Sequence, residues 1–300
     1  SRGPAQCVDG KCLCMEGFCS RDGKCYQRQG TLHAEVVPIN SRQSTFPGNQ
    51  GHVRTAVCFS GGGARAHALT VGGLRALEDL GLMSHVDAVS TVSGSAWAGS
   101  VYMFSRKKPQ DILGAPTSPS QLTMRYLDKQ TSPLGKVVTD DFAPIALWLK
   151  ASGVWMKRLW VRTVGKAILE PFGLDDTDAY MAQDEAAVAR IKKANPQLRN
   201  AKFQTPNPSR PGVFVMGGLL VAPEGYLGDG NNAVPLEMSP DFTGSPFYPD
   251  SRRLAYKPSS NYAKKYGLPP TLEQMIVGGG MVETFAFGGA APQQQNGGQS

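Results

Sequence analysis

Histidine and cysteine are scarce in this chain of 300 residues, and long apolar runs are absent. The four histidines are His33, His52, His67 and His85, so none follows residue 85. No segment approaches the roughly 20 consecutive apolar residues that a membrane-spanning helix requires. The sequence therefore predicts no transmembrane segment, and a site built after residue 85 would have to take any histidine from earlier in the chain.

Acidic residues are in short supply relative to basic ones. Lys and Arg number 31 against 24 Asp and Glu, which gives a net charge of +7. An excess of positive charge suits an anionic partner, either a phospholipid surface or a nucleic acid. The chain contains no nucleic-acid recognition motif. We therefore expect a phospholipid membrane surface as partner, with anionic lipid favoured, and no nucleic acid.

Cysteine usage sets the first 26 residues apart as a small Cys-rich module. The pattern is C-x4-C-x-C-x4-C-x5-C with glycine turns between the cysteines, which are Cys7, Cys12, Cys14, Cys19 and Cys25. Such density without a core favours disulfides and a secreted or lumenal location. The module resembles half of an epidermal-growth-factor-like repeat. A zinc knuckle is the alternative, although the module has no paired C-x2-C and no histidine. The sixth cysteine, Cys58, is expected to be a buried core thiol between Val57 and Phe59.

Composition divides the rest of the chain into three parts. Residues 27–54 are rich in Ser, Gln, Asn, Gly and Pro and predict a linker or irregular lead-in. Residues 55–289 predict one folded domain with an apolar core. Residues 290–300 form a polar, Gly/Gln-rich run that predicts a flexible end, and we expect the domain to be incomplete at this C-terminus.

The domain begins with alternating strand and helix signals. The apolar run 55–60 predicts a buried strand, and three glycines follow it. Leu69, Gly73, Leu77 and Leu80 then recur at helical spacing up to Gly81, a residue type typical of the position after a helix. A second strand over 85–93 and a second helix over 94–107 follow. This order predicts an α/β fold with parallel strands and right-handed crossovers.

The glycine loop after the first strand allows two interpretations. Gly61-x-Gly63-x-x-Ala66 matches the loose pattern of a dinucleotide site, which also needs an acid at the end of the second strand. The nearby acid, Asp87, comes at the start of that strand instead. The second strand ends at Ser93, followed by the small residues Gly94 and Ser95, and this is the context of a nucleophile elbow. Because both loops leave the same sheet edge, the second interpretation makes the glycines donors to an oxyanion.

All four histidines precede Ser93, so the Ser, acid, His order of an α/β-hydrolase is not met within this chain. A serine–carboxylate dyad is left, and "GGGARA" followed by "SGSAW" resembles the patatin-like and cytosolic phospholipase A superfamily, in particular its lysophospholipase branch. The resemblance implies that Gly61, Gly62 and Gly63 form the oxyanion hole and that Ser93 is the nucleophile. It implies that Arg65 faces the substrate phosphate or supports the loop.

Two later segments extend the resemblance to about residues 55–289: Pro235–Phe247 and Val282–Gly289. The implied fold is a three-layer, parallel-sheet patatin-like hydrolase core. The implied function is hydrolysis of fatty-acyl esters of membrane lipids, without a metal or other cofactor. In the family the catalytic aspartate lies in a later Asp-Gly turn, so we expect it beyond residue 300. Asp229 is the alternative base within the chain, and a catalytically incomplete lipid-binding homologue is the alternative function.

The chain departs from the family pattern at Thr91, where the elbow motif has glycine.

Two further segments allow competing interpretations. Residues 146–169 interleave tryptophans with basic residues: Trp148, Trp155 and Trp160 with Lys150, Lys157, Arg158, Arg162 and Lys166. This pattern is typical of a membrane interface. The alternative, which we favour from the sequence, is a core helix that buries its tryptophans while the lysines remain solvated. Asp175, Asp176 and Asp178 form an acidic cluster that resembles a calcium site, but we interpret it as the capped start of a helix.

Overall fold

A computed structural model describes the following residues: 5–8, 11–14, 18–21, 24–27, 32–39, 53–114, 116, 118–121, 123, 142–154, 156–220, 227, 234–245, 252–257, 271–276 and 279–287. Asp229, Trp155 and residues 290–300 lie outside them.

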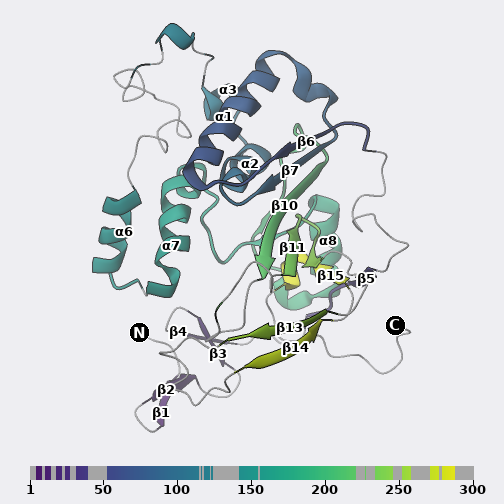
Figure 1. Ribbon diagram of the computed structural model, residues 1–300. Coiled ribbons are helices and arrows are strands. Elements are labelled where there is room, and N and C mark those ends of the chain that lie inside the picture. Colours follow the sequence, from purple (N-terminus) through teal and green to yellow (C-terminus); the bar gives the residue numbers. More distant parts are fainter. Residues whose placement is uncertain are drawn as a thin grey trace.

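The described part of the chain is built around a seven-stranded mixed sheet in the order β5-β15-β12-β11-β10-β7-β6 (Figure 1). Its strands are β5 (Val36–Ile39), β6 (Ala56–Phe59), β7 (Ala88–Val92), β10 (Val213–Leu220), β11 (Val234–Met238), β12 (Phe242–Ser245) and β15 (Gly279–Glu283). β6, β7 and β10 are parallel. The remaining pairs are antiparallel, so the expected parallel sheet accounts for three of its strands.

The α/β fold class is confirmed, and so is the predicted order of its first elements. Strand β6 leads through the glycine loop into α1 (Gly63–Asp79), and β7 leads directly into α2 (Gly94–Phe104). Gly81 follows the end of α1 with φ 69°, the left-handed conformation expected of it. Both helices cover the same face of the parallel strands. This is expected because the chain moves from β6 to β7 to β10 in one direction across the sheet, and right-handed crossovers in one direction put their helices on one face.

The buried face of α1 differs from the predicted leucine stripe. Leu69 is 76% exposed, and Leu80 is also exposed. The buried residues are instead Ala66, His67, Thr70, Val71 and Leu74. A side chain at Gly73 would meet Phe59 Cε1 at 2.9 Å, so the helix lies close against β6 on this face. Packing against α2 and β6 therefore buries a different face of the helix, while part of the leucine stripe stays in solvent.

Cys58 is exposed, which makes the prediction of a buried core thiol wrong. Along β6 the burial alternates, with Val57 and Phe59 packed against the core and Ala56 and Cys58 on the other side. Side chains of a strand point to opposite faces in turn. Cys58 therefore lies on the face of β6 that α1 and α2 do not cover.

Helices lie on both faces of the sheet, over different strands. Thr91 faces α2, because a side chain at Gly99 of that helix would meet its Cγ2 at 2.7 Å. The residues paired from β7 across the sheet to β15 show that the side chain of Glu283 points to the face opposite that of Thr91. Glu283 is paired with Arg190 of α8 (Glu185–Ala194), so α8 packs on that second face. The two helical layers with the sheet between them agree with the expected layered architecture.

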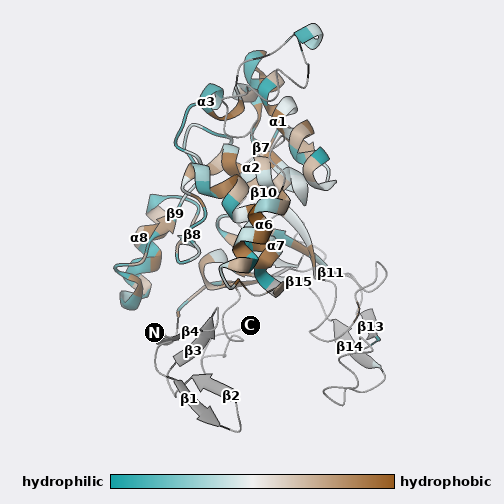
Figure 2. Cartoon of the chain, turned by 90° about the vertical axis from the view of Figure 1, so that its left-hand side faces the viewer, coloured by the Kyte–Doolittle hydropathy of each residue, from teal (hydrophilic) through white to brown (hydrophobic). Residues whose placement is uncertain are grey.

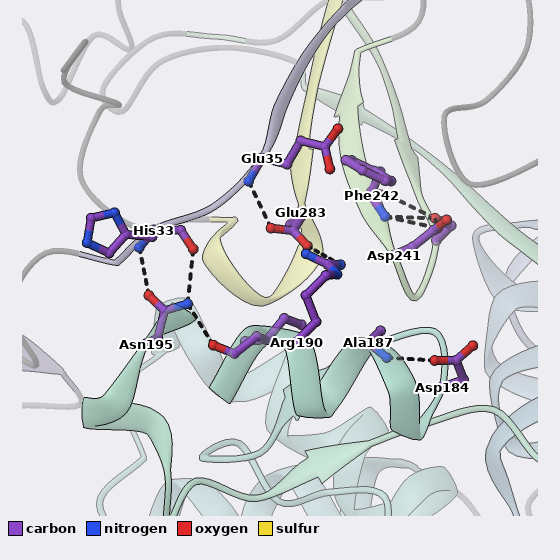
Figure 3. Close-up of polar contacts among 11 residues, drawn as sticks. His33, Glu35, Asp184, Ala187, Arg190, Asn195, Asp241, Phe242 and Glu283 are labelled. Carbon is purple, nitrogen blue, oxygen red and sulfur yellow. Dashed lines mark hydrogen bonds and ion pairs between the residues drawn. The ribbon is translucent and has the colours of Figure 1, made fainter. Parts of the chain in front are cut away.

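The expected linker contains a strand of the sheet. Within residues 27–54, β5 pairs with β15 in the register Val36 to Val282. Figure 3 shows how the residues before β5 are held: Asn195 accepts from His33 N–H at 2.7 Å and donates to its carbonyl at 3.0 Å. Residues 32–39 therefore belong to the folded domain, and the linker prediction is wrong for them.

The buried carboxylate of Glu283 joins three elements at this end of the sheet (Figure 3). It accepts from Glu35 N–H at 2.8 Å and forms an ion pair of 2.6 Å with Arg190. A buried carboxylate needs such partners, since an unpaired one is costly to desolvate. The pair fixes the lead-in, β15 and α8 to one another.

The acidic cluster does not cap a helix, so that prediction is wrong. Asp176 pairs with Lys202 at 2.9 Å and accepts from Asp178 N–H at 3.0 Å in a loop. The helix begins later, where Asp184 caps α8 by accepting from Ala187 N–H at 2.7 Å. The short strand β8 (Tyr180–Met181) lies between the cluster and the helix, so sequence proximity alone misplaced the cap.

The remaining described elements are small. The Cys-rich module contains two hairpins, and its backbone register sets Cys7 opposite Cys12. The elements are β1 (Ala5–Val8), β2 (Lys11–Cys14), β3 (Phe18–Arg21), β4 (Lys24–Gln27), η1 (Leu82–His85), α3 (Pro109–Leu113), η2 (Pro119–Gln121), α6 (Phe142–Ala151), α7 (Met156–Val164), η3 (Gly165–Leu169), η4 (Glu170–Phe172), β8 (Tyr180–Met181), η5 (Pro196–Leu198), β9 (Phe203–Gln204), β13 (Arg252–Tyr256), β14 (Leu272–Ile276) and η6 (Thr284–Ala286). The cysteine side chains of the module lie outside what the structure describes.

Replacing either of two buried threonines of the sheet by valine should change the free energy of unfolding, in opposite directions. Thr91 is fully buried, and its hydroxyl has no hydrogen-bond partner among the described residues. Thr91→Val keeps the shape and removes an unsatisfied polar group, so it should raise the free energy of unfolding by about 1 kcal/mol or more. Thr243 is also buried but shares a 2.8 Å hydrogen bond with Thr284, so Thr243→Val should lower it by about 1 kcal/mol.

Urea unfolding of the two variants and the parent measures both changes. Equal destabilisation by the two substitutions would mean that the Thr91 hydroxyl does have a partner.

Candidate active site

Ser93 occupies a strained turn between β7 and α2. Its φ of 57° and ψ of −122° make it the one non-glycine residue with positive φ in the described part of the chain. Such backbone strain is costly and clusters at functional sites. Ser93 also stands at the N-cap of α2, where a serine usually caps the helix, yet its hydroxyl makes no capping bond. The turn thus exposes the side chain and leaves its oxygen available.

The glycine loop lies directly against this turn. A side chain at Gly61 would meet Ser93 Cβ at 3.1 Å. A side chain at Gly94 would come within 2.0 Å of the Gly63 carbonyl oxygen. Gly62 and Gly63 themselves have φ of 147° and 62°, which other residues rarely adopt. The structure therefore brings Gly61, Gly62 and Gly63 together with Ser93, as the motif predicted.

Ser95 fastens the two strand ends to each other. Its buried hydroxyl accepts from Val92 N–H at 2.8 Å and lies 2.8 Å from the Val92 carbonyl and 2.9 Å from the Phe59 carbonyl. One of these carbonyls receives its proton. The sequence suggested Ser95 only as a small residue of the elbow, because a cross-strand role depends on the register of β6 and β7. Ser95 positions the turn, and Ser93 presents the free hydroxyl.

Two helix N-termini converge at this edge of the sheet. Both α1 and α2 start at the loop pair, and neither has an acidic residue in its first turn. Free backbone N–H groups and the helix dipoles make such a place favourable for negative charge. Arg65, exposed in the first turn of α1, adds a positive charge to the same edge. The arrangement can stabilise an anion that develops next to Ser93.

Asp87 cannot complete a dinucleotide site at this edge. Its carboxylate accepts from Arg54 N–H at 2.8 Å and Thr55 N–H at 3.1 Å, before the start of β6. The Arg54 hydrogen bond, together with that from Thr55, lowers the pKa of Asp87. A cavity of about 670 Å³ lies beside it, lined by Tyr102 and Arg210 among others, and does not include Ser93. The acid that the dinucleotide pattern needs therefore stands at the opposite edge.

The segment with "PLEMSPDF" forms β11, a short turn and β12, and it contains a carboxyl group that sequence reasoning missed. Glu237 lies opposite Gly217, which in turn lies opposite Val92, the residue before Ser93. Burial raises the pKa of Glu237 above its usual value. A glutamate inside an otherwise apolar strand is the signal that could have drawn attention to it. The alternative base Asp229 lies outside the described residues.

The Trp-basic segment forms α6, α7 and η3, and its described tryptophans are not core residues. Trp148 and Trp160 are both more than half exposed. The core interpretation is therefore wrong for these two residues. None of the described helices is long and apolar enough to cross a bilayer.

Comparison with known proteins gives only a weak likeness. No family model matches the chain, and no curated protein matches it. Among solved structures, human GIVD cytosolic phospholipase A2 matches at a TM-score of 0.31 and 20% identity in its complex with a fluorophosphonate inhibitor and terbium chloride. A second structure of that human protein matches at a TM-score of 0.30 and 18% identity. The likeness covers 64% of this chain but 24% and 22% of the respective chains matched. At scores this low we draw no functional conclusion from it.

Proposed function

We propose that this chain carries the nucleophile and oxyanion hole of a serine acyl hydrolase that cleaves fatty-acyl esters of membrane lipids. The observation that carries the proposal is the backbone of Ser93, strained to φ 57° beside a glycine loop in contact with it. Strain of this kind at a strand-to-helix turn is the signature of a nucleophile elbow. The family resemblance of the two motifs supplies the substrate class.

In the proposed reaction the Ser93 oxygen attacks the ester carbonyl carbon and forms a tetrahedral intermediate. Backbone N–H groups of Gly61, Gly62 and Gly63 stabilise its oxyanion, a contribution typically worth about 3 kcal/mol per donor. The alcohol of the lipid leaves as the intermediate collapses to an acyl-serine, which water then hydrolyses. The two helix N-termini add favourable potential for the same negative charge.

We propose a carboxylate as the base that takes the Ser93 proton, in a Ser-Asp dyad. By the resemblance we propose an aspartate in a later Asp-Gly turn for this role, and Asp229 is the alternative within the chain. Arg65 is proposed to face the substrate phosphate, because it is exposed in the helix turn that follows the glycine loop. No cofactor is required by this chemistry.

A serine-directed fluorophosphonate probe tests the proposal on the full-length protein. Only an activated hydroxyl beside an oxyanion hole reacts quickly with such a phosphorus electrophile. Peptide mapping by mass spectrometry should find the label on Ser93. Rapid labelling of another serine, or of none, would contradict the assignment.

We also propose that the Cys-rich module 1–26 is stapled by disulfides and that the protein is secreted or lumenal. The density of cysteine supports this, because a segment too small for a core needs covalent links. Mass spectrometry of the non-reduced protein should find two disulfides among the five cysteines. Five free thiols with bound zinc would favour the zinc knuckle.

A further inference from the structure

The hairpin of α6 and α7 is attached to the helix that carries Ser93. Trp97 lies one turn after Ser93 on α2, and its ring contacts Phe142 of α6 and Trp160 of α7 at centroid distances of 6.1 and 6.0 Å. Phe142 and Trp160 also contact each other edge to face at 5.7 Å. These packed rings fix the hairpin beside the candidate active site, and Figure 1 shows its two helices next to each other.

The hairpin also exposes large apolar side chains to solvent. Figure 2 looks onto the hairpin and shows apolar residues on both of its helices. Their exposed fractions are 70% for Leu147, 55% for Trp148, 66% for Met156, 57% for Trp160 and 69% for Val161. Single exposed apolar residues are common, but five on two short helices form a patch of the kind that marks an interaction site.

Basic residues predominate in the sequence of this hairpin. The 28 residues from 142 to 169 contain no Asp or Glu and five basic residues: Lys150, Lys157, Arg158, Arg162 and Lys166. Lys166 places its ammonium 5.0 Å from the Trp148 ring centroid and also pairs with Glu170 just after the segment. A segment that combines basic residues with exposed tryptophan and aliphatic side chains suits the headgroup region of a lipid layer.

The excess of basic residues also favours one occupant over the others. A second copy of this chain docked hairpin to hairpin would bring basic residues against basic residues, which repel each other. A nucleic acid would be attracted by the basic residues but would leave the exposed Leu147, Met156 and Val161 without apolar contacts. An anionic bilayer satisfies both features at once.

We propose that the α6–α7 hairpin is a docking surface for anionic lipid bilayers. Leu147, Trp148, Met156, Trp160 and Val161 enter the layer between headgroups and acyl chains, and the basic residues bind lipid phosphates. Docking holds α2, and Ser93 with it, next to the lipid. The docking step does not depend on catalysis, whereas its benefit for turnover rests on the proposed hydrolase function.

Binding to vesicles of phosphatidylcholine, with and without phosphatidylserine, tests the proposal. It is measured on full-length protein carrying Ser93→Ala, so that hydrolysis does not alter the vesicles. The charge variant Lys157→Gln/Arg158→Gln/Arg162→Gln should bind phosphatidylserine vesicles about 100-fold more weakly than the parent. Each basic residue near an anionic surface contributes roughly fivefold to the affinity. The apolar variant Leu147→Gln/Val161→Gln should lose at least about tenfold on these vesicles.

Matched controls separate docking from a general change of charge or surface. Lys108→Gln/Lys193→Gln/Arg199→Gln removes three exposed charges elsewhere, and Leu80→Gln/Leu82→Gln removes two exposed leucines at the opposite edge. Both should bind as the parent does. Docking is refuted if the parent binds neither kind of vesicle, or if hairpin and control variants lose binding equally.

Activity measurements keep this proposal distinct from the proposed function. Without Ser93→Ala, both hairpin variants should hydrolyse a soluble short-chain ester at the parent rate and lose activity only on vesicles. A parent protein that binds anionic vesicles through the hairpin but hydrolyses no ester would refute the hydrolase proposal and leave docking intact.

Discussion

Replacing Ser93 by alanine should lower ester hydrolysis by the full-length protein by about 10⁴-fold or more. Removal of a serine nucleophile leaves only the contribution of substrate binding and the oxyanion hole. Because Ser93 is exposed and its hydroxyl caps nothing, the fold should be unaffected. Turnover of a chromogenic ester and the unfolding temperature measure the two effects.

Two other serines serve as controls for this substitution. Ser84 is an exposed residue at the far edge, so Ser84→Ala should leave turnover unchanged. Ser95→Ala should still allow fluorophosphonate labelling of Ser93, but its lost bonds to Val92 and Phe59 should lower stability. If the Ser93→Ala protein hydrolyses esters at the parent rate, the nucleophile is a different residue.

Gly94→Ala should disrupt the site although it adds one methyl group. The new Cβ would lie 2.0 Å from the Gly63 carbonyl oxygen and 2.7 Å from Gly63 Cα, both backbone atoms that cannot rotate away. Either the glycine loop or the start of α2 must shift. A displacement of about 1 Å is enough to cost roughly 100-fold in turnover, and overpacking should lower the free energy of unfolding by about 1–3 kcal/mol.

Gly72→Ala is the matched control for that substitution. Gly72 is exposed in the interior of α1, and nothing lies within 4 Å of its added Cβ. Since alanine favours the helix, this variant should be more stable than the parent by about 0.5–1 kcal/mol with unchanged turnover. Equal behaviour of the two alanine variants would show that Gly94 does not pack against the loop.

The candidate site was readable from the sequence because its signals are local. Three glycines after a strand and Ser-Gly-Ser before a helix specify two turns through backbone conformations that few other residues allow. Their meeting follows from one parallel crossover. The role of Ser95 could not be predicted from these local signals. Its partners Val92 and Phe59 come together only when β6 and β7 pair in register.

By itself the sequence determined the order β6, α1, β7, α2, the left-handed Gly81 and the elbow at Ser93, since each depends on neighbours within a few residues. The tertiary structure alone decided which side chains are buried. Leu69 and Cys58 are residue types that are usually buried in a core, yet both are exposed because no other described element packs over them. Val36 lies in a polar lead-in, yet it pairs with Val282, almost 250 residues later. Burial depends on what comes to lie opposite a residue, and a local pattern does not encode that.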